Sequence, residues 1–453
     1  MRRLLTAAAS AALLLPLAAC GTSGAGDGGG TVTVTVGYQS KTINTVTAGT
    51  LLRSLGYFER ELRAQGRRDG VTYKVRWQDY ATGAPITAAM IAGKVDIGSM
   101  GDFPLLINAS RGKQLDAPTR LVAVTGYNLR GALNTIVTRP GSTLRTLTDL
   151  RGKKVSTSVG SAADGTLVRA LAGVGLDAGK EVHKLNQQPA VGASALAAGS
   201  ADALSQFVAW PGLLAHQGKA QVLYDGGQLD LPTFHGVTVR RAFADKRSGV
   251  VQAFLAAQRD ATRYLYAHPV RAAESVARTT GLPAEVVYLY NGADGIATFD
   301  PTLKPRLLDA LRKDVSVLTA AKLAGPVDVD AFVDDRHIKR LYGAGYAKAV
   351  ADVPDHGASE VWLKGEAATR RFGTPAAALA YLAGHGGAAA ARAVYVPDAT
   401  TGTRWFADRS VWVRDGAGTV RPFTAPATAD AWLAAHPGSR LVSYAAALRE
   451  AAS

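Results

Sequence analysis

The sequence predicts an α/β protein with largely parallel sheets, because predicted strands alternate with predicted helices along the chain. Two observations lead to this prediction. Residues 31–36 (T-V-T-V-T-V) alternate strictly between polar and apolar, which is typical of a strand with one buried face. A second block, beginning near Thr135, repeats a pattern of small residues, an aspartate, an apolar strand and a loop. The 453 residues leave room for two or three domains.

The remaining elements follow in order along the two blocks. The first block predicts a helix containing Leu51, Leu52 and Leu55, a strand at 71–77, a helix through Met90, and a strand within 95–102. The second block predicts a strand at 154–158, a turn at Gly160-Ser161, a helix from near Ala163, a strand at 183–186, a helix across 190–198 and a strand within 200–208. From about His235 to Gly343 the pattern is mostly helical.

The N-terminal residues have the layout of a secretory signal. Arg2 and Arg3 precede an apolar stretch at 4–17, which is shorter than the roughly 20 residues that cross a bilayer. The stretch leads into L-A-A-C at 17–20, which resembles the bacterial lipobox. Cys20 is the only cysteine in the chain. This predicts lipidation at Cys20 after removal of residues before it, with the Gly-rich residues 21–30 as a flexible tether. The alternative is a stray cysteine behind an ordinary signal peptide.

Composition narrows the class of partner. One thiol allows no internal disulfide and no cysteine metal cluster, so a hydrophobic core must hold the fold. The formal net charge of +15 suggests attraction to anions or to an acidic envelope; the alternative is a cationic surface without a single partner. There is no dense Lys/Arg block interleaved with aromatic residues, so nucleic acid is not an expected partner.

Five motifs, in order, resemble signature stretches of the substrate-binding proteins of ABC transporters, and in particular the aliphatic sulfonate, taurine and nitrate binders. They are V-G-Y-Q-S at 36–40, G-K-V-D-I-G-S-M-G-D-F-P at 93–104, L-R-G-K-K-V at 150–155, G-S-A-D-A at 199–203 and D-V-D-A-F-V-D-D at 328–335. The resemblance covers about residues 31–345.

The resemblance implies a two-lobed, type II periplasmic-binding-protein-like fold with the ligand bound between the lobes. The first lobe would comprise about residues 31–130 and 235–345, and the second about 131–234. A small anion would be the ligand and an ABC permease the membrane partner. The resemblance implies no cofactor and no metal. Sulfonates, sulfate esters, nitrate and pyrimidine precursors all remain open as ligands.

Three predicted strand-to-helix turns would supply the anion site. Open α/β sheets bind ligands at the carboxyl ends of their strands, and helix N-termini offer unpaired, partially positive N–H groups. Small residues in these turns let an anion approach the backbone. The candidate turns are Thr82-Gly83-Ala84, Gly101-Asp102-Phe103 and Gly160-Ser161-Ala162.

Further roles come from the resemblance, each with a structural alternative. Gln39 would reach the cleft and donate from its amide. Asp102 would pair with an amine such as that of taurine, or simply cap its helix. Ser161 would donate to the ligand or serve as an N-cap. Trp210 and Phe207 would cover an aliphatic part of the ligand, or pack in the core.

His235 lies near the expected return to the first lobe, and we interpret it as a satisfied structural histidine and not as a ligand.

Residues 355–453 extend beyond the family and contain an internal duplication. Segments 361–385 and 411–436 match with an offset of about 51 residues. The equivalent pairs are Phe372 and Phe423, Pro375 and Pro426, Tyr381 and Trp432, and His385 and His436. Each copy predicts a hairpin, a helix that begins at its proline, and a closing strand, at 391–396 and 440–444. Tyr381, Leu382, Trp432 and Leu433 are the expected core residues.

The duplicated pattern resembles that of the copper-accessory lipoprotein NosL. That resemblance would imply copper binding through Cys, Met or His, but residues 355–453 contain neither Cys nor Met. Only His356, His385 and His436 remain, and two of them are repeat equivalents at helix ends. We therefore expect a small α+β packing or interaction domain, docked on the binder or the envelope, and no metal site.

The leading hypothesis is a lipid-anchored receptor on the extracytoplasmic face of the membrane, which captures a small anion by hinge closure. It is not expected to be an enzyme, because the sequence has no G-x-S-x-G, no H-E-x-x-H and no cysteine nucleophile after Cys20. An enzyme or binder resembling thiamin-precursor synthases on the same fold is one alternative. A sensor or interaction lipoprotein that works through the duplication is the other.

Overall fold

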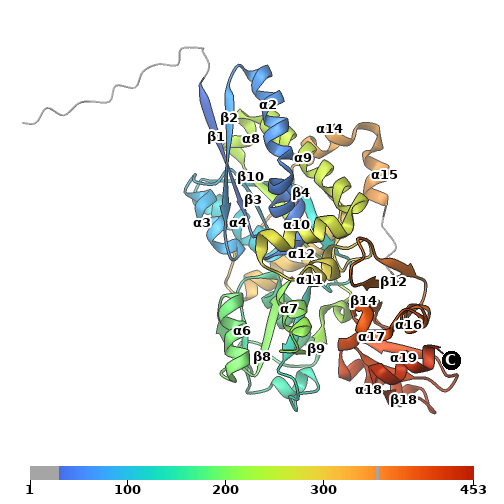
Figure 1. The fold of residues 1–453 in the computed structure, drawn as a ribbon. Coiled ribbons are helices and arrows are strands. Elements are labelled where there is room, and N and C mark those ends of the chain that lie inside the picture. Colours follow the sequence, from blue (N-terminus) through green and yellow to red (C-terminus); the bar gives the residue numbers. More distant parts are fainter. Residues whose placement is uncertain (1–29, 353–356, 453) are drawn as a thin grey trace, which may run out of the picture.

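The computed structural model describes residues 30–352 and 357–452. Within them the chain forms two α/β lobes, one above the other, with the C-terminal extension beside the lower lobe (Figure 1). The predicted signal, Cys20, nearly all of the tether and His356 lie outside the described residues. Among the described helices, none is long and apolar enough to cross a membrane.

Lobe 1 is built on a six-stranded sheet with the order β11-β4-β10-β3-β1-β2. Its strands are β1 (Thr31–Tyr38), β2 (Thr72–Asp79), β3 (Ile97–Gly101), β4 (Thr119–Asn128), β10 (Thr233–Arg240) and β11 (Thr298–Phe299). β1 pairs in parallel with both β2 and β3, whereas β10 runs antiparallel to β3 and β4.

The predicted strand at 31–36 is confirmed, but its burial differs from the prediction. Residues 34–38 are buried on both faces, because β1 lies inside the sheet and helices cover both sides. One buried face is found instead along the edge strand β2, whose residues alternate between exposed and half-buried.

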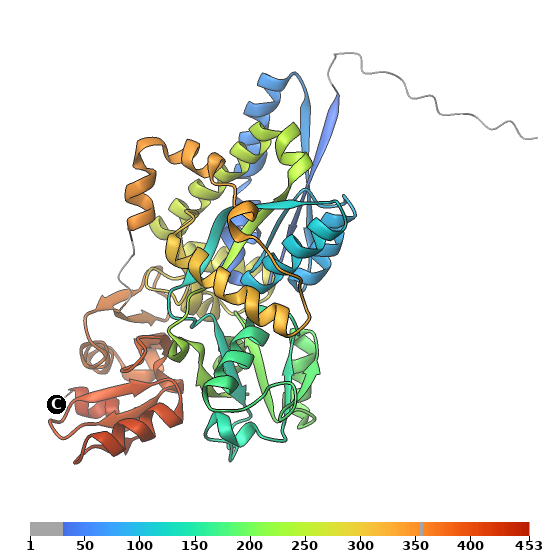
Figure 2. The ribbon, with the colours of Figure 1, turned by 180° about the vertical axis from the view of Figure 1, so that it is seen from behind.

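Helices cover the sheet of lobe 1 on both faces, and a helical arm extends beyond it (Figure 2). Those before the crossing are η1 (Ile43–Ala48), α1 (Thr50–Leu55), α2 (Tyr57–Asp69), α3 (Gly83–Ile91) and α4 (Asp102–Gln114). Those after it are α8 (Arg241–Lys246), α9 (Ser248–Ala267), α10 (Pro269–Thr280), α11 (Ala284–Asn291), α12 (Pro305–Ala320), α13 (Val329–Phe332), α14 (Arg336–Tyr342), η4 (Gly343–Gly345) and α15 (Tyr346–Ala351).

Lobe 2 has a five-stranded sheet with the order β7-β6-β8-β5-β9. Its strands are β5 (Asn134–Thr138), β6 (Lys154–Thr157), β7 (His183–Asn186), β8 (Ala203–Phe207) and β9 (Gln221–Asp225). Its helices are η2 (Leu147–Leu150), α5 (Ala162–Gly173), α6 (Pro189–Ala198), α7 (Trp210–His216) and η3 (Gly226–Leu229). β6, α5, β7, α6 and β8 match the second predicted block, whereas β9 was not predicted. The prediction of largely parallel sheets is wrong, because β5 runs antiparallel to both β8 and β9 here, and β10 runs antiparallel to its neighbours in lobe 1.

The chain crosses between the lobes twice, between β4 and β5 and between η3 and β10. One side chain shapes the first crossing: Asn128 Oδ1 accepts N–H groups from Arg130, Gly131 and Ala132 at 3.0–3.1 Å. The second crossing ends in β10, a strand inside a region predicted to be mostly helical. Thr233 and Phe234, assigned from sequence to the second lobe, therefore lie in the sheet of lobe 1.

In the segments predicted to be duplicated, the extension forms two hairpin–helix–strand units. The first unit is β12 (Ser359–Leu363), β13 (Arg370–Phe372), α16 (Pro375–Gly384) and β14 (Ala391–Pro397). The second is β16 (Val411–Arg414), β17 (Val420–Phe423), α18 (Pro426–Ala435) and β18 (Arg440–Val442). Four elements lie outside the repeat: α17 (Gly387–Ala390), β15 (Arg404–Phe406), η5 (Ala407–Arg409) and α19 (Tyr444–Ala452).

Each unit carries the same aromatic–histidine stack at its helix end. Tyr381 stacks on His385 with ring centroids 3.9 Å apart, and Trp432 stacks on His436 at 3.8 Å. The Nδ1 atom of each histidine lies within hydrogen-bond distance of a backbone carbonyl in the last helical turn. These geometries fit the structural role expected for both histidines.

The expected core of the extension needs a correction. Leu382 is fully buried, but Tyr381, Trp432 and Leu433 are only half-buried. The two helices pack differently: α16 contacts its sheet and α19, whereas α18 contacts β16, β17 and β9 of lobe 2.

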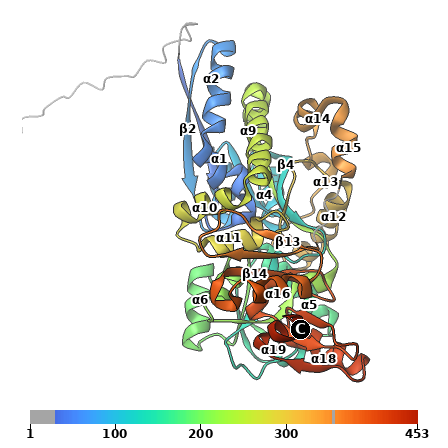
Figure 3. The same ribbon diagram turned by 45° about the vertical axis from the view of Figure 1, so that its right-hand side comes forward.

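The extension packs against both lobes (Figure 3). One hydrophobic cluster joins Trp362, Tyr395 and Phe406 of the extension to α11 of lobe 1 and to α7 and β9 of lobe 2. The extension is therefore part of the same folded body as the two lobes.

Candidate functional site

The site lies between the lobes, where three helices begin. α3 starts after Thr82, α4 after Gly101 and α5 after Ser161, so each predicted turn does lead into a helix. The first N–H groups of such helices have no partner inside their own helix and carry partial positive charge. α3 and α4 belong to lobe 1 and α5 to lobe 2, so the two lobes contribute to this site together.

The N-termini of α4 and α5 face each other closely. A Cβ atom placed on Gly101 would lie 3.6 Å from the Ala162 Cβ of the opposite lobe, and 3.2 Å from the imidazole of His235. A Cβ on Gly165 would clash with the ring of Phe103. Glycine at both positions therefore allows the close approach of the lobes.

Gln39 is buried at the end of β1, and its amide is engaged within lobe 1. Its Nε2 donates to the Ser99 carbonyl at 3.1 Å, and its Oε1 accepts from Thr42 Oγ1 at 3.3 Å. These bonds hold Gln39 beside the carboxyl end of β3, close to the N-terminus of α4.

Asp102 makes its hydrogen bonds to its own chain. Its Oδ1 accepts from the Phe103 N–H at 2.8 Å, and its Oδ2 accepts from Thr233 Oγ1 at 2.6 Å and from the Phe234 N–H at 3.4 Å. Burial raises the pKa of Asp102, and these donors oppose that effect. The geometry favours the helix-end alternative over pairing with a ligand amine, and it ties α4 to the second crossing.

Ser161 is the N-cap of α5, because its Oγ accepts from the Asp164 N–H at 3.3 Å. Asp164 in turn accepts from the Gly160 N–H at 3.0 Å and pairs with Lys184 Nζ at 3.0 Å. Gly160 has a φ of +80°, a conformation that favours glycine. These bonds hold the turn, and the first N–H groups of α5 have no acceptor within their own helix.

Phe207 is the last residue of β8, within the strand, whereas Trp210 follows that strand as predicted. Phe207 is buried and pairs with Asn134 in the sheet, which favours the packing alternative. Trp210 begins α7 and is half-buried. Two positions later the Gly212 N–H donates to Tyr290 Oη of α11 at 3.0 Å, so α7 meets lobe 1 here.

The structure also brings in residues that sequence reasoning missed or set aside. Asn44 of η1 is fully buried, and its Nδ2 lies 2.8 Å from Nδ1 of His235. In the sequence, Asn44 is noticeable only as a polar residue within the segment I-N-T-V-T-A. In the structure, this segment is buried throughout. Burial alone lowers the pKa of His235 to about 3, so the ring is neutral.

An ion pair joins the lobes on one side of this site. Arg169 Nη2 of α5 donates to Asp314 Oδ1 of α12 at 2.6 Å and to the Lys313 carbonyl at 3.0 Å. Burial, together with the neighbouring carboxyl of Asp102, raises the pKa of Asp314, and Arg169 opposes that effect. The pair crosses the cleft and holds this closed arrangement.

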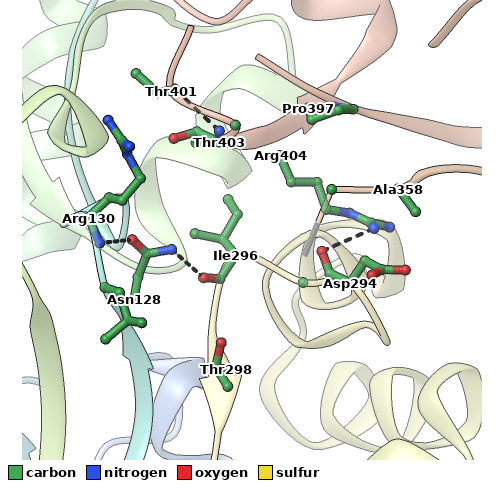
Figure 4. A pocket seen from close by; sticks show the side chains of 14 residues that line it. Asn128, Arg130, Asp294, Ile296, Thr298, Ala358, Pro397, Thr401, Thr403 and Arg404 are labelled. Carbon is green, nitrogen blue, oxygen red and sulfur yellow. Dashed lines mark hydrogen bonds between the residues drawn. The ribbon is translucent and has the colours of Figure 1, made fainter. Parts of the chain in front are cut away.

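A separate cavity of about 190 Å³ lies beside the first crossing, against the extension (Figure 4). Asn128, Arg130, Asp294, Thr401 and Arg404 are among its lining residues. Arg404 is turned to its own neighbours: its Nη1 donates to the Asp294 carbonyl and to Glu360, and its guanidinium lies 4.4 Å from the centroid of the Tyr395 ring. This cavity is outside the interlobe site.

Within the described residues, no group of three or more His, Cys, Asp or Glu side chains is placed to hold a metal ion.

Two α/β lobes, a double crossing and opposed helix N-termini define the class: a two-lobed fold of the periplasmic-binding-protein kind. In the comparison with known proteins, residues 73–272 match the family described as NMT1/THI5 like. The family resemblance expected from the sequence is confirmed for this part of the chain, and the resemblance of the extension to NosL stays a prediction.

Curated relatives have modest identity to this chain. A putative aliphatic sulfonates-binding protein of Escherichia coli K12 is 28% identical over 217 residues, which are 48% of this chain and 66% of that protein. The taurine-binding periplasmic protein of the same organism is 29% identical over 218 residues, 46% of this chain and 65% of that protein. Both alignments span slightly less than two thirds of the relative.

Solved structures share the fold. The alkanesulfonate-binding protein SsuA from Xanthomonas axonopodis pv. citri, bound to MOPS, superposes with a TM-score of 0.56 at 24% identity, over 67% of this chain and 98% of that one. The periplasmic nitrate-binding protein NrtA from Synechocystis PCC 6803 gives 0.53 at 14% identity, over 72% and 92%. The predicted two-lobed fold is confirmed.

Proposed function

We propose that this protein is an extracytoplasmic solute-binding protein that captures a small anion and delivers it to an ABC importer. The observation that carries the proposal is the meeting of the α4 and α5 N-termini, one from each lobe, at Gly101 and Ala162. Such helix ends bind anions through backbone N–H groups. The curated relatives are named as sulfonate- and taurine-binding proteins, which favours an aliphatic sulfonate such as taurine as the ligand.

The mechanism is closure about the two crossings. In the open state the N-termini of α4 and α5 are apart, and a ligand that contacts both stabilises the closed state by its differential affinity. The permease then distinguishes the closed, loaded form from the open one. Only non-covalent contacts change in this cycle.

Ligand binding is tested by thermal unfolding of the purified protein with taurine, ethanesulfonate, nitrate and sulfate. A ligand at 100 times its dissociation constant adds about 2.7 kcal/mol of stability. Gly101→Ala should reduce that gain, because its Cβ would crowd His235 and Ala162. Gly173→Ala, in the same helix as Ala162 but with no atom within 4 Å of its Cβ, is the matched control. Equal stabilisation of both variants would contradict this site.

The membrane anchor is a second part of the proposal. It rests on Cys20 and the residues before it, which the sequence alone supports. Mass spectrometry of the mature N-terminus should find a lipid-modified cysteine. Cys20→Ala should release the protein from the membrane fraction, and retention of this variant would contradict the anchor.

An enzyme on the same fold is the competing function. The desulfurization enzyme DSZB, solved as a mutant in complex with biphenyl-2-sulfinic acid, superposes with a TM-score of 0.50 at 19% identity, so the fold alone does not separate binding from catalysis. This chain offers no cysteine after Cys20 as a nucleophile. Recovery of every bound compound unchanged after incubation would support binding, whereas product formation would support the enzyme.

A further inference from the structure

His235 stands at the point where the second crossing enters the sheet of lobe 1. In the antiparallel register of β10 and β3, His235 lies opposite Gly101, the residue that caps α4. Its side chain is largely buried, since its relative exposure is 5%. A histidine of lobe 1 is thereby fixed beside the start of a helix that faces lobe 2.

The hydrogen bonds of Asn44 determine which ring nitrogen carries the proton. Asn44 Nδ2 lies 3.3 Å from the Gly126 carbonyl, which only accepts, so this atom is the amide nitrogen. The same nitrogen lies 2.8 Å from His235 Nδ1 and donates its second hydrogen there. Nδ1 is therefore the acceptor, and in a neutral ring the proton is on Nε2.

The protonated edge of the ring points toward the interlobe site. Both Cε1 and Nε2 of His235 lie 3.2 Å from the position of a Cβ on Gly101, and the Ala162 Cβ of lobe 2 lies 3.6 Å from the same position. No residue of the described chain accepts a hydrogen bond from Nε2. A donor in a largely buried side chain thus lies beside the point where the two helix N-termini meet.

We propose that the Nε2–H group of His235 is a ligand donor of the interlobe site. The inference rests on the proposed binding function and specifies its chemistry. The ring donates one hydrogen bond from Nε2, while the bond from Asn44 to Nδ1 holds the orientation of the ring. The N-termini of α4 and α5 supply further N–H groups from either side.

A titratable group lies close to this ring. Asp102 starts α4 directly after Gly101, and its carboxyl accepts from the N–H of Phe234, the chain neighbour of His235. Burial raises the pKa of Asp102. The effect of His235 on the pH profile is therefore measured as the difference between the wild type and a variant without the imidazole.

The neutral state of the ring gives a pH signature. Burial is the only cause that lowers the pKa of His235, to about 3, and no charged neighbour contributes. His235 therefore donates from a neutral ring throughout the range of about pH 5 to 8. Titration of His235 should therefore not change the affinity for a sulfonate across this range.

The test is calorimetric titration of the wild type, His235→Phe and His235→Gln with ethanesulfonate, nitrate and sulfate. Phenylalanine keeps the ring and removes the donor, whereas glutamine can restore a donor near Nε2. The lost hydrogen bond is one to a charged ligand, so we expect His235→Phe to bind ethanesulfonate about 10- to 100-fold more weakly than the wild type. His235→Gln should recover part of this affinity. His183→Phe, at an exposed position in β7, is the control. Unfolding without ligand shows whether each variant is folded.

Each outcome has a distinct meaning. Equal affinity of the wild type and His235→Phe would overturn the role of His235 and leave the binding function standing. A difference between the wild type and His235→Phe in how affinity changes from about pH 8 to about pH 5 would overturn the neutral donor. Failure of the wild type to bind any of the three anions would overturn this inference together with the proposed function.

Discussion

At the scale of single residues, the most heavily buried ion pair among the described residues lies where the extension meets lobe 1. Arg404 and Glu360 are 2.9 Å apart, with side chains 4% and 1% exposed. Glu360 also accepts from Tyr288 Oη and Thr369 Oγ1, both at 2.6 Å. The carboxylate is thus fully engaged, and it joins β12 and β15 to α11.

Removing the charge of Glu360 should destabilise the protein strongly. Glu360→Gln leaves the Arg404 guanidinium buried without its counter-ion, a change that typically costs about 3–5 kcal/mol. Glu366→Gln is the matched control, because its pair with Arg370 at 3.6 Å is largely exposed and is worth about 1 kcal/mol or less. Urea unfolding measures both variants. A similarly small loss of unfolding free energy in both variants would contradict the role of the buried pair.

The same carboxylate should give stability a dependence on pH. Burial alone would raise the pKa of Glu360, but Arg404 and the hydrogen bonds hold this pKa at about 2, below its ordinary value of 4.5. A depressed carboxyl pKa stabilises the fold above the unfolded pKa, and this contribution is lost as pH falls toward the folded pKa. The stability gap between wild type and Glu360→Gln should therefore be constant above about pH 5 and shrink toward about pH 2, as measured by urea unfolding. A constant gap would contradict this assignment.

At the scale of elements, caps and crossings determine where the site can form. Ser161 caps α5 beside the cleft, and Thr374 caps α16 in the extension by accepting from the Ala377 N–H at 3.1 Å. β10 carries His235 to the start of α4 because it enters the sheet between β3 and β4. In both caps a hydroxyl oxygen accepts from a backbone N–H of the first helical turn, but only Ser161 lies at the proposed ligand site.

Alanine at either cap should cost about 1 kcal/mol of stability. Ser161→Ala should also weaken anion binding, because the start of α5 faces the ligand. Thr374→Ala should leave binding unchanged at the same loss of stability. Chemical unfolding and calorimetry of the two variants separate the effects, and equal affinities would show that Ser161 only caps its helix.

At the scale of the whole molecule, the extension touches both lobes on the side of the crossings. Arg371 holds Asp294 of lobe 1 through two bonds of 2.8 Å, and Thr401 Oγ1 donates to Asp225 of lobe 2 at 2.8 Å. Arg409 reaches the His216 carbonyl at the end of α7, at 3.4 Å. The extension therefore bridges the lobes in this arrangement.

Loosening the contacts with lobe 2 should shift the molecule toward the open state. The double variant Thr401→Val and Arg409→Ala removes two of these contacts and keeps those with lobe 1. We expect a larger radius of gyration without ligand in solution scattering, and weaker anion binding. Arg449→Ala, at an exposed position in α19, is the control. An unchanged radius and affinity would mean that the extension does not influence closure.

Sequence periodicity and turn chemistry were sufficient for most elements. The T-V-T-V-T-V strand, the three strand-to-helix turns and the repeated hairpin–helix–strand units depend on residues close together in the chain, so local patterns predict them. Both repeat prolines begin their helices for the same reason. β10 was not predicted, because its short run of alternating residues directly precedes a long helical region.

The sequence by itself determined the fold class, the helix starts that face the cleft and the duplication of the extension. Only the tertiary structure decided that His235 faces these helix starts, that Asp102 bonds its own chain, and that the extension contacts both lobes. The physical reason is distance along the chain. Asn44 and His235 are 191 residues apart, and Thr401 and Asp225 are 176 apart. No local pattern encodes such contacts, which form only when separate elements pack together.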